Sequence, residues 1–160
     1  DHDAEAHVQL GLLYEKRGQR EKALGHYRRA IEIDPTEPDA NFQLGVVERL
    51  SGKYSDAISR FETIVRKDDR FRQSEVWREV GATYLGAGMH AEAQSALEKY
   101  LERRPFDPEG LYYYGEALQG LGKSQEAMAA YAKCIEAVNT MPYYRRTQLQ
   151  RWSKLARARM

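Results

Sequence analysis

The residues of this sequence best able to bind a metal or act as nucleophiles are four histidines and one cysteine: His2, His7, His26, His90 and Cys134. None of the histidines stands in a spacing such as His-x-x-x-His, which places two ligands on one helix face. A single cysteine excludes an internal disulfide and a cysteine-based zinc site. No serine or cysteine lies within a nucleophile motif, and no glycine-rich loop could hold a phosphate. We therefore predict no catalytic residue, no metal and no cofactor, and expect that the protein is not an enzyme.

Packing explains two of these residues better than chemistry does. His7 lies in an apolar-periodic segment. Cys134 lies at a small-residue position of another such segment, and a buried cysteine behaves as a small hydrophobic residue. We expect both side chains to be packing residues.

The segments that hold these residues repeat along the chain. Each series of small residues steps by 34, 36 and 34 residues. The first glycine series is Gly11, Gly45, Gly81 and Gly115; the second is Gly18, Gly52, Gly88 and Gly122; the alanine series is Ala23, Ala57, Ala93 and Ala127. A fixed period of this length indicates an array of small units, each of which buries its apolar face against its neighbours.

The first unit shows how each repeat folds. Apolar residues at helical spacing predict a helix over residues 4–17 and a second over about 21–33. Gly18 follows the first helix, where a left-handed residue commonly ends one, and Pro35 stops the second. Gly11 lies inside the first helix, at a cost of about 1 kcal/mol relative to alanine. We expect this glycine to let the second helix cross closely at Ala23, where only a methyl group projects.

The order and spacing of these residues resemble the tetratricopeptide repeat. The residues that carry the resemblance in the first copy are Leu10, Gly11, Tyr14, Gly18, Ala23, Tyr27, Ala30 and Pro35. The resemblance implies an all-α fold, a right-handed superhelical solenoid of four helix-turn-helix repeats with a capping helix. We expect one domain over residues 1–160, with repeats at about 4–37, 38–71, 74–107 and 108–141 and the capping helix at about 142–158.

Two places depart from the family pattern. The link over residues 67–73 carries two extra residues, and Asp69 stands where the family has proline. We expect a longer connection there, with Phe71 filling the joint between repeats. Tyr100 occupies a position that is usually alanine, so we expect adjusted packing against the fourth repeat.

The family also implies where a partner would bind, because the first helix of each repeat lines a concave groove and the second helix lies outside it. Arg49 and Arg78 flank the apolar part of this surface, which suggests a ligand with apolar anchors and an acidic flank. An exposed apolar groove usually marks a partner site. The predicted groove residues are Val8, Leu12, Phe42, Val46, Arg49, Leu50, Arg78, Leu85 and Tyr112. Partial burial of this groove by neighbouring helices is an equally supported interpretation.

The C-terminal segment suggests an alternative. Residues 142–160 hold six Lys and Arg residues and no acidic residue, whereas the other residues hold 19 basic and 24 acidic ones. Such asymmetry can mark a tail that meets an anionic partner. Leu149, Trp152 and Ala156 lie on one helix face, which we interpret as the cap of the array. Four further tyrosines, Tyr112, Tyr113, Tyr143 and Tyr144, are interpreted either as part of the cap joint or as an adhesive surface patch.

These patterns predict a protein-interaction scaffold that binds a peptide or helix of a partner protein. Nucleic acid is not an expected ligand. The alternative is an oligomerisation or membrane-adjacent module, in which the basic C-terminal helix meets a second copy or an anionic membrane. No apolar run approaches the roughly 18 residues of a membrane span. We expect a soluble fragment of a longer or processed chain; the compartment stays open, with the cytoplasm slightly favoured.

Overall fold

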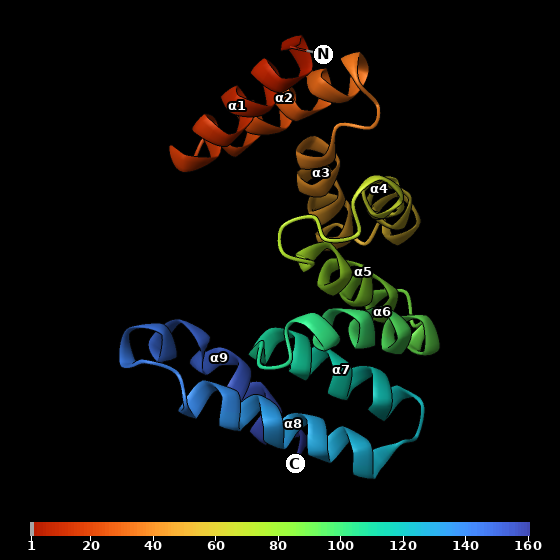
Figure 1. Cartoon of the computed structure of the whole chain (residues 1–160), viewed down its shortest axis with the longest axis vertical. Coiled ribbons are helices and arrows are strands. Elements are labelled where there is room, and N and C mark those ends of the chain that lie inside the picture. The colour runs from red at the N-terminus through yellow and green to blue at the C-terminus, as the bar shows by residue number, and fades with distance from the viewer. Residues whose placement is uncertain (1) are drawn as a thin grey trace. The chain divides into compact units, whose positions relative to one another are not determined.

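The computed structural model describes residues 2–160, and helices are the only regular elements in that range. They are α1 (His2–Lys16), α2 (Arg20–Ile33), α3 (Pro38–Leu50), α4 (Tyr54–Lys67), α5 (Glu75–Gly86), α6 (His90–Arg103), α7 (Pro108–Gly120), α8 (Ser124–Asn139) and α9 (Tyr143–Arg159) (Figure 1). The all-α fold class of paired helices is therefore confirmed. No helix in the described range is both long and apolar enough to cross a membrane.

The chain divides into two compact units, Asp1–Val76 and Trp77–Met160. The first unit contains α1 to α4, and the second contains nearly all of α5 together with α6 to α9. The single domain predicted over residues 1–160 remains a prediction.

The turns and helix starts follow from local chemistry. Each turn glycine has a φ between 71° and 77°, the left-handed conformation that glycine adopts at no steric cost. Pro38 and Pro108 stand at the first positions of α3 and α7, where a missing N–H costs nothing. The carboxylates just before them, Glu37 and Asp107, accept hydrogen bonds from backbone N–H groups of the first turn. The residues at the ends of these helices therefore determine where the helices begin and end.

The glycines inside the first helices leave room for a large side chain of the second helix. A Cβ atom on Gly11 would lie 2.5 Å from Cε1 of Tyr27. The ring of Tyr27 thus occupies the space that the glycine leaves. The same arrangement recurs in the other repeats, in the pairs Gly45–Phe61, Gly81–Leu97 and Gly115–Tyr131. Each repeat is held by one large side chain of its second helix lying over the bare backbone of its first.

Three successive residues with positive φ follow α4. The φ angles are 50° at Arg72, 54° at Gln73 and 71° at Ser74, and none of these residues is glycine. The guanidinium of Arg72 lies 4.5 Å from the centre of the Phe42 ring and binds Asp39 at 2.8 Å. Phe71 also packs on Phe42, with ring centres 5.8 Å apart. The extra residues of this link therefore form a left-handed turn that covers Phe42.

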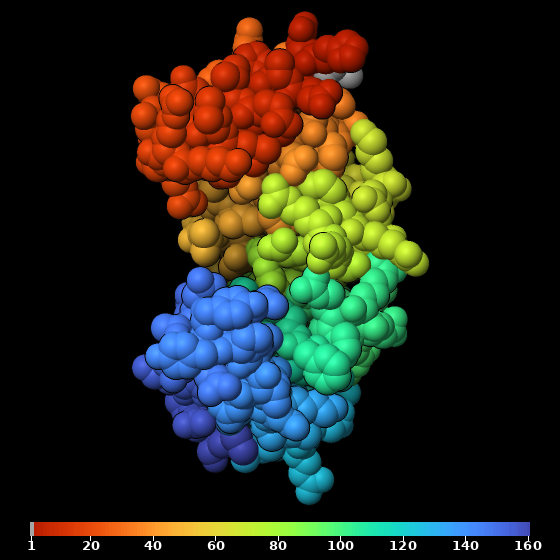
Figure 2. Space-filling view, turned by 60° about the vertical axis from the view of Figure 1, so that its left-hand side comes forward, coloured from red at the N-terminus to blue at the C-terminus, as the bar shows by residue number. Residues whose placement is uncertain are grey.

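The second unit ends in a packed aromatic cluster. Trp152 of α9 is buried and lies 5.6 Å from Tyr112 and 5.4 Å from Tyr113, measured between ring centres. Ala156 is fully buried in the same cluster, and Leu149 packs against it. In Figure 2 the atoms of α8 and α9 form one continuous blue surface. The predicted apolar face of the last helix is thus the face that packs.

The adjusted packing expected at Tyr100 is observed. Its ring is buried against Gly110 at the start of α7, where an added Cβ would lie 2.5 Å from Cε1 of Tyr100. The large residue is accommodated because its neighbour has no side chain.

Candidate protein-interaction site

In the first unit the predicted groove residues differ in exposure. Leu50 is 63% exposed, and Leu12, Val46 and Arg49 are partly exposed. Val8 is buried at 2%, within the cluster that surrounds Tyr27. Val46 and Leu50 stand one turn apart on α3, so they share a face of that helix.

Phe42 is buried and does not offer an open ring to a ligand. It is 4% exposed, because Phe61, Phe71 and Arg72 lie around it. The helical register of Phe42 predicts a place on the groove surface. The residues that cover it come from α4 and from the link after α4, which the register of α3 does not reveal.

In the second unit Arg78 belongs to an internal charge network. Its side chain is 15% exposed and lies 3.4 Å from Asp107, 3.5 Å from Glu109 and 3.9 Å from Glu79. The guanidinium also lies 5.8 Å from the centre of the Tyr100 ring. These contacts join α5 to the start of α7. Arg78 therefore has a structural role in the second unit.

This network also changes the titration of Glu109. Burial raises the pKa of Glu109, and the charge of Arg78 and a hydrogen bond donated by Tyr113 partly oppose this rise. Glu79 and Asp107 raise the same pKa further through repulsion. The proton affinity of this carboxylate is therefore coupled to the contact between α5 and α7.

The remaining predicted groove residues of the second unit also differ. Leu85 is partly exposed, whereas Tyr112 is 8% exposed against Tyr131 and Trp152. Tyr112 and Tyr113 therefore belong to the cap joint. Tyr143 and Tyr144 do not: they are 81% and 72% exposed at the start of α9. The cap-joint interpretation therefore applies to Tyr112 and Tyr113, whereas an adhesive patch at Tyr143 and Tyr144 stays a prediction.

His7, His26 and Cys134 have packing partners. Nδ1 of His7 lies 3.0 Å from Nδ1 of His26, whose ring stacks on Tyr14. Cys134 is fully buried, and its Sγ donates to the carbonyl oxygen of Pro108 at 3.2 Å. Burial raises the pKa of this thiol to about 12. Within residues 2–160, no three or more His, Cys, Asp or Glu side chains gather in a group able to hold a metal.

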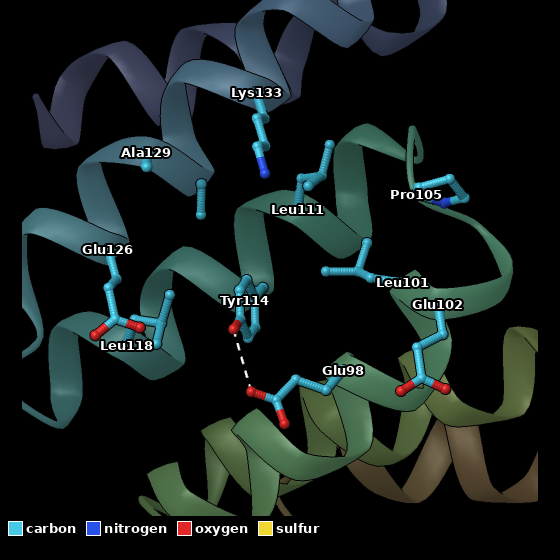
Figure 3. A pocket seen from close by; sticks show the side chains of 11 residues that line it. Glu98, Leu101, Glu102, Pro105, Leu111, Tyr114, Leu118, Glu126, Ala129 and Lys133 are labelled. Atoms are coloured by element: carbon cyan, nitrogen blue, oxygen red, sulfur yellow. Dashed lines mark hydrogen bonds between the residues drawn. The ribbon is translucent and has the colours of Figure 1, made fainter.

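A pocket that is absent from the predictions made from the sequence lies between α6, α7 and α8. Its volume is about 500 Å³. Figure 3 shows Leu101, Leu111 and Leu118 around it, with Glu98 and Glu102 projecting from α6 and Glu126 and Lys133 from α8. The residues that line it are Glu98, Leu101, Glu102, Pro105, Leu111, Tyr114, Leu118, Glu126, Ala129, Ala130 and Lys133. The only sequence signal for it is the acidic pair Glu98 and Glu102, one helical turn apart.

Comparison with known sequences decides the family. Three sequence models, each described as a tetratricopeptide repeat, match residues 4–37, 26–59 and 81–142, well over half of the chain together. The chain belongs to the tetratricopeptide repeat family. This confirms the resemblance, and it places the chain in a class of proteins that generally act as protein-interaction scaffolds.

The relatives of this tetratricopeptide repeat chain are much longer proteins. It is 29% identical over 133 residues to the general transcriptional corepressor ssn6 of Schizosaccharomyces pombe, matching 82% of this chain and 12% of the relative. It is 34% identical over 95 residues to a CTR9 homolog of Arabidopsis thaliana, matching 58% of this chain and 8% of the relative. The chain therefore spans about a tenth of these two proteins.

Solved structures show the same fold. A crystal structure of MamA is 22% identical in sequence and superposes with a TM-score of 0.72 over 86% of this chain and 74% of that one. YrrB, described as a tetratricopeptide repeat protein with an unusual peptide-binding site, is 20% identical, with a TM-score of 0.72 over 99% of this chain and 87% of that one. At these identities the likeness concerns the fold.

Proposed function

We propose that the chain is a non-catalytic scaffold that binds a peptide or helix of a partner protein along the first helices of its repeats. The observation that carries the proposal is the exposure of Leu50, at 63%, one turn from the partly exposed Val46. Arg49 is adjacent and partly exposed, which favours a ligand with an acidic group beside its apolar anchors. Within the first unit, Leu12 is the other partly exposed apolar residue of the proposed surface. In the second unit, the partly exposed apolar residue of the proposed surface is Leu85 of α5.

A second candidate is binding through the basic start of α9. Tyr143 and Tyr144 are largely exposed, and the exposed Arg145 follows them. Aromatic and arginine residues dominate the energetically important parts of many interfaces. The partner of this surface would be an anionic protein, a second copy or an anionic membrane.

The test compares two variants of the whole chain as affinity baits. Leu50→Asp changes an exposed side chain, so we expect an unchanged melting temperature and loss of the captured partner. Tyr143→Ser combined with Tyr144→Ser changes only the α9 surface and should retain that partner. We also expect capture by the groove to change little with salt, whereas capture by the basic helix should weaken as salt rises.

The opposite pattern would contradict the groove. If Leu50→Asp retains the partner and the double tyrosine variant loses it, the second candidate replaces the first. Phe42→Ala is not suitable for this comparison, because removing a buried aromatic ring costs about 3–5 kcal/mol and would confound binding with folding.

A further inference from the structure

We propose a second binding site, separate from the groove, in the pocket between α6, α7 and α8. Its ligand is a peptide segment in which an apolar side chain is flanked by lysine or arginine. The proposal does not depend on the proposed groove, because the pocket lies entirely within the second unit and uses other residues.

The base of the pocket is apolar and already formed. Leu111 and Leu118 are almost fully buried, at 4% and 1% exposed, and Leu101 is partly buried. Ala129 and Ala130 line the side formed by α8 and leave room because their side chains are short. α7 lies between α6 and α8, so it forms the base while the other two helices form the walls (Figure 1). The volume of about 500 Å³ lies within the range of about 300–1,000 Å³ typical of ligand pockets.

The charge at the rim of the pocket favours a positively charged side chain of the ligand. Glu98, Glu102 and Glu126 are exposed there, and Lys133 is the only basic residue in the lining. Complementary charge across an interface selects partners and speeds their encounter. An acidic peptide or a nucleic-acid phosphate would be repelled by the three carboxylates, whereas a lysine or arginine beside an apolar anchor would meet them.

One of these carboxylates is held in place. Glu98 accepts hydrogen bonds from the hydroxyl of Tyr114 at 3.2 Å and from the amide of Gln94 at 2.7 Å. Burial raises the pKa of Tyr114, and the charge of Glu98 raises it further, so the hydroxyl remains a neutral donor. A positioned acceptor loses less conformational entropy when a ligand binds than a mobile one does.

The pocket and the predicted groove use different faces of α7. Leu111, Tyr114 and Leu118 line the pocket and follow the spacing of one helix face. Tyr112 lies about 100° around the helix from Leu111 and packs on Trp152. A ligand in the pocket therefore leaves the other face of α7 unchanged.

The experiment uses the whole chain, isotope-labelled, and follows its amide signals by NMR. The probe is an acetylated, amidated pentapeptide of alternating lysine and leucine that begins and ends with lysine. We expect saturable shifts at Leu111, Tyr114 and Ala129. In one control peptide glutamate replaces every lysine, and in the other serine replaces every leucine. We expect each control peptide to bind at least about tenfold more weakly than the probe.

Matched variants test the site itself. Ala129→Trp fills the pocket and should abolish binding, whereas Ala132→Trp places the same side chain at an exposed position of α8 outside the lining and should not. Glu98→Gln combined with Glu102→Gln should weaken binding about fivefold. Glu136→Gln, on the exposed surface of α8 outside the pocket, should leave binding unchanged.

Several results would overturn the proposal. The first is that Ala129→Trp binds the probe peptide as tightly as the unchanged chain does. The second is that Ala132→Trp loses as much affinity as Ala129→Trp. The third is that the control peptide with serine in place of leucine binds as tightly as the probe, because the binding would then be unspecific charge attraction. Thermal melts of each variant separate loss of the site from loss of the fold. Leu50→Asp should bind the probe as the unchanged chain does, so failure of the groove proposal and failure of this one give different results.

Discussion

Gly11 and Gly25 lie in the paired helices α1 and α2, but their surroundings differ. A Cβ on Gly11 would overlap the ring of Tyr27, whereas one on Gly25 would meet nothing within 4 Å. Alanine is the better helix former at either position by about 1 kcal/mol. At Gly11 the lack of space outweighs the gain in helix propensity, whereas at Gly25 the space is open and helix propensity acts alone. The change in stability caused by alanine should therefore have opposite signs at the two positions.

We predict that Gly11→Ala destabilises the protein by about 1–3 kcal/mol, the usual cost of overpacking a core. Gly25→Ala should stabilise it by up to about 1 kcal/mol, because the residue is exposed within α2. Urea unfolding followed by circular dichroism measures both changes. If Gly11→Ala were stabilising, the contact between Tyr27 and the backbone of α1 could not be what holds this repeat together.

Glu109 makes stability depend on pH. Its pKa is raised above the ordinary value of 4.5, mainly by burial, so the folded state binds this proton more tightly than the unfolded state does. Its contribution to stability is therefore present at low pH and is lost as pH rises through the raised pKa. We predict that the unchanged protein gains stability relative to Glu109→Gln as the pH falls from neutral toward 4.5.

Melting temperatures of the two proteins across this range test the sign. Other carboxylates titrate in both proteins, so only the difference between the two curves reports Glu109. Parallel curves would show that Arg78 and Tyr113 fully offset the burial of the carboxylate.

Among the elements, α9 makes the most direct prediction. Trp152 is 7% exposed against α7 and α8, and Arg159 binds Glu116 of α7 at 2.9 Å. We expect Trp152→Ala to cost about 3–5 kcal/mol, as for other buried aromatic residues. Lys154→Ala, on the exposed side of the same helix, should cost less than about 0.5 kcal/mol.

Deleting residues 142–160 should lower the melting temperature strongly, because it removes the helix that covers α7 and α8. If the truncated protein stays monomeric and its melting temperature is unchanged, α9 is not a cap.

The left-handed turn after α4 favours glycine over alanine at position 73. The left-handed conformation raises the free energy of a residue other than glycine by about 1–2 kcal/mol. Glycine avoids that steric cost, but its greater loss of backbone entropy on folding costs about 0.5–1 kcal/mol. We therefore expect Gln73→Gly to be more stable than Gln73→Ala by about 0.5–1 kcal/mol. The two variants lose the same side-chain contacts, so their difference in chemical denaturation isolates the backbone. Equal stability would mean that the turn relaxes without glycine.

At the scale of the whole molecule, the helices could be predicted because their signals are local. The second helix was expected over about 21–33 and is observed as Arg20–Ile33. Turn glycines and the prolines that open α3 and α7 act within a few residues, so one sequence suffices to find them. The predicted basic helix after Pro142 is α9 for the same reason.

The interaction surfaces could be predicted only in part. Helical register assigned Leu50 and Phe42 alike to the groove, yet Phe42 is covered by Phe71 and Arg72, about 30 residues later in the chain. The pocket between α6 and α8 depends on the separation of two helices that both pack on α7. Periodicity gives the order of helices but not the distance between them.

The burial of Cys134 has a practical consequence for chemical labelling. It is the only cysteine in the sequence and is fully buried, so the folded chain presents no accessible thiol. We predict that a thiol-reactive dye labels the native protein far more slowly than the urea-unfolded protein; equal rates would contradict the burial. A cysteine introduced by Ala129→Cys would then be the only thiol that a dye could reach in the folded chain. A reporter dye attached there would place a spectroscopic probe at the wall of the pocket, without removing any native residue elsewhere.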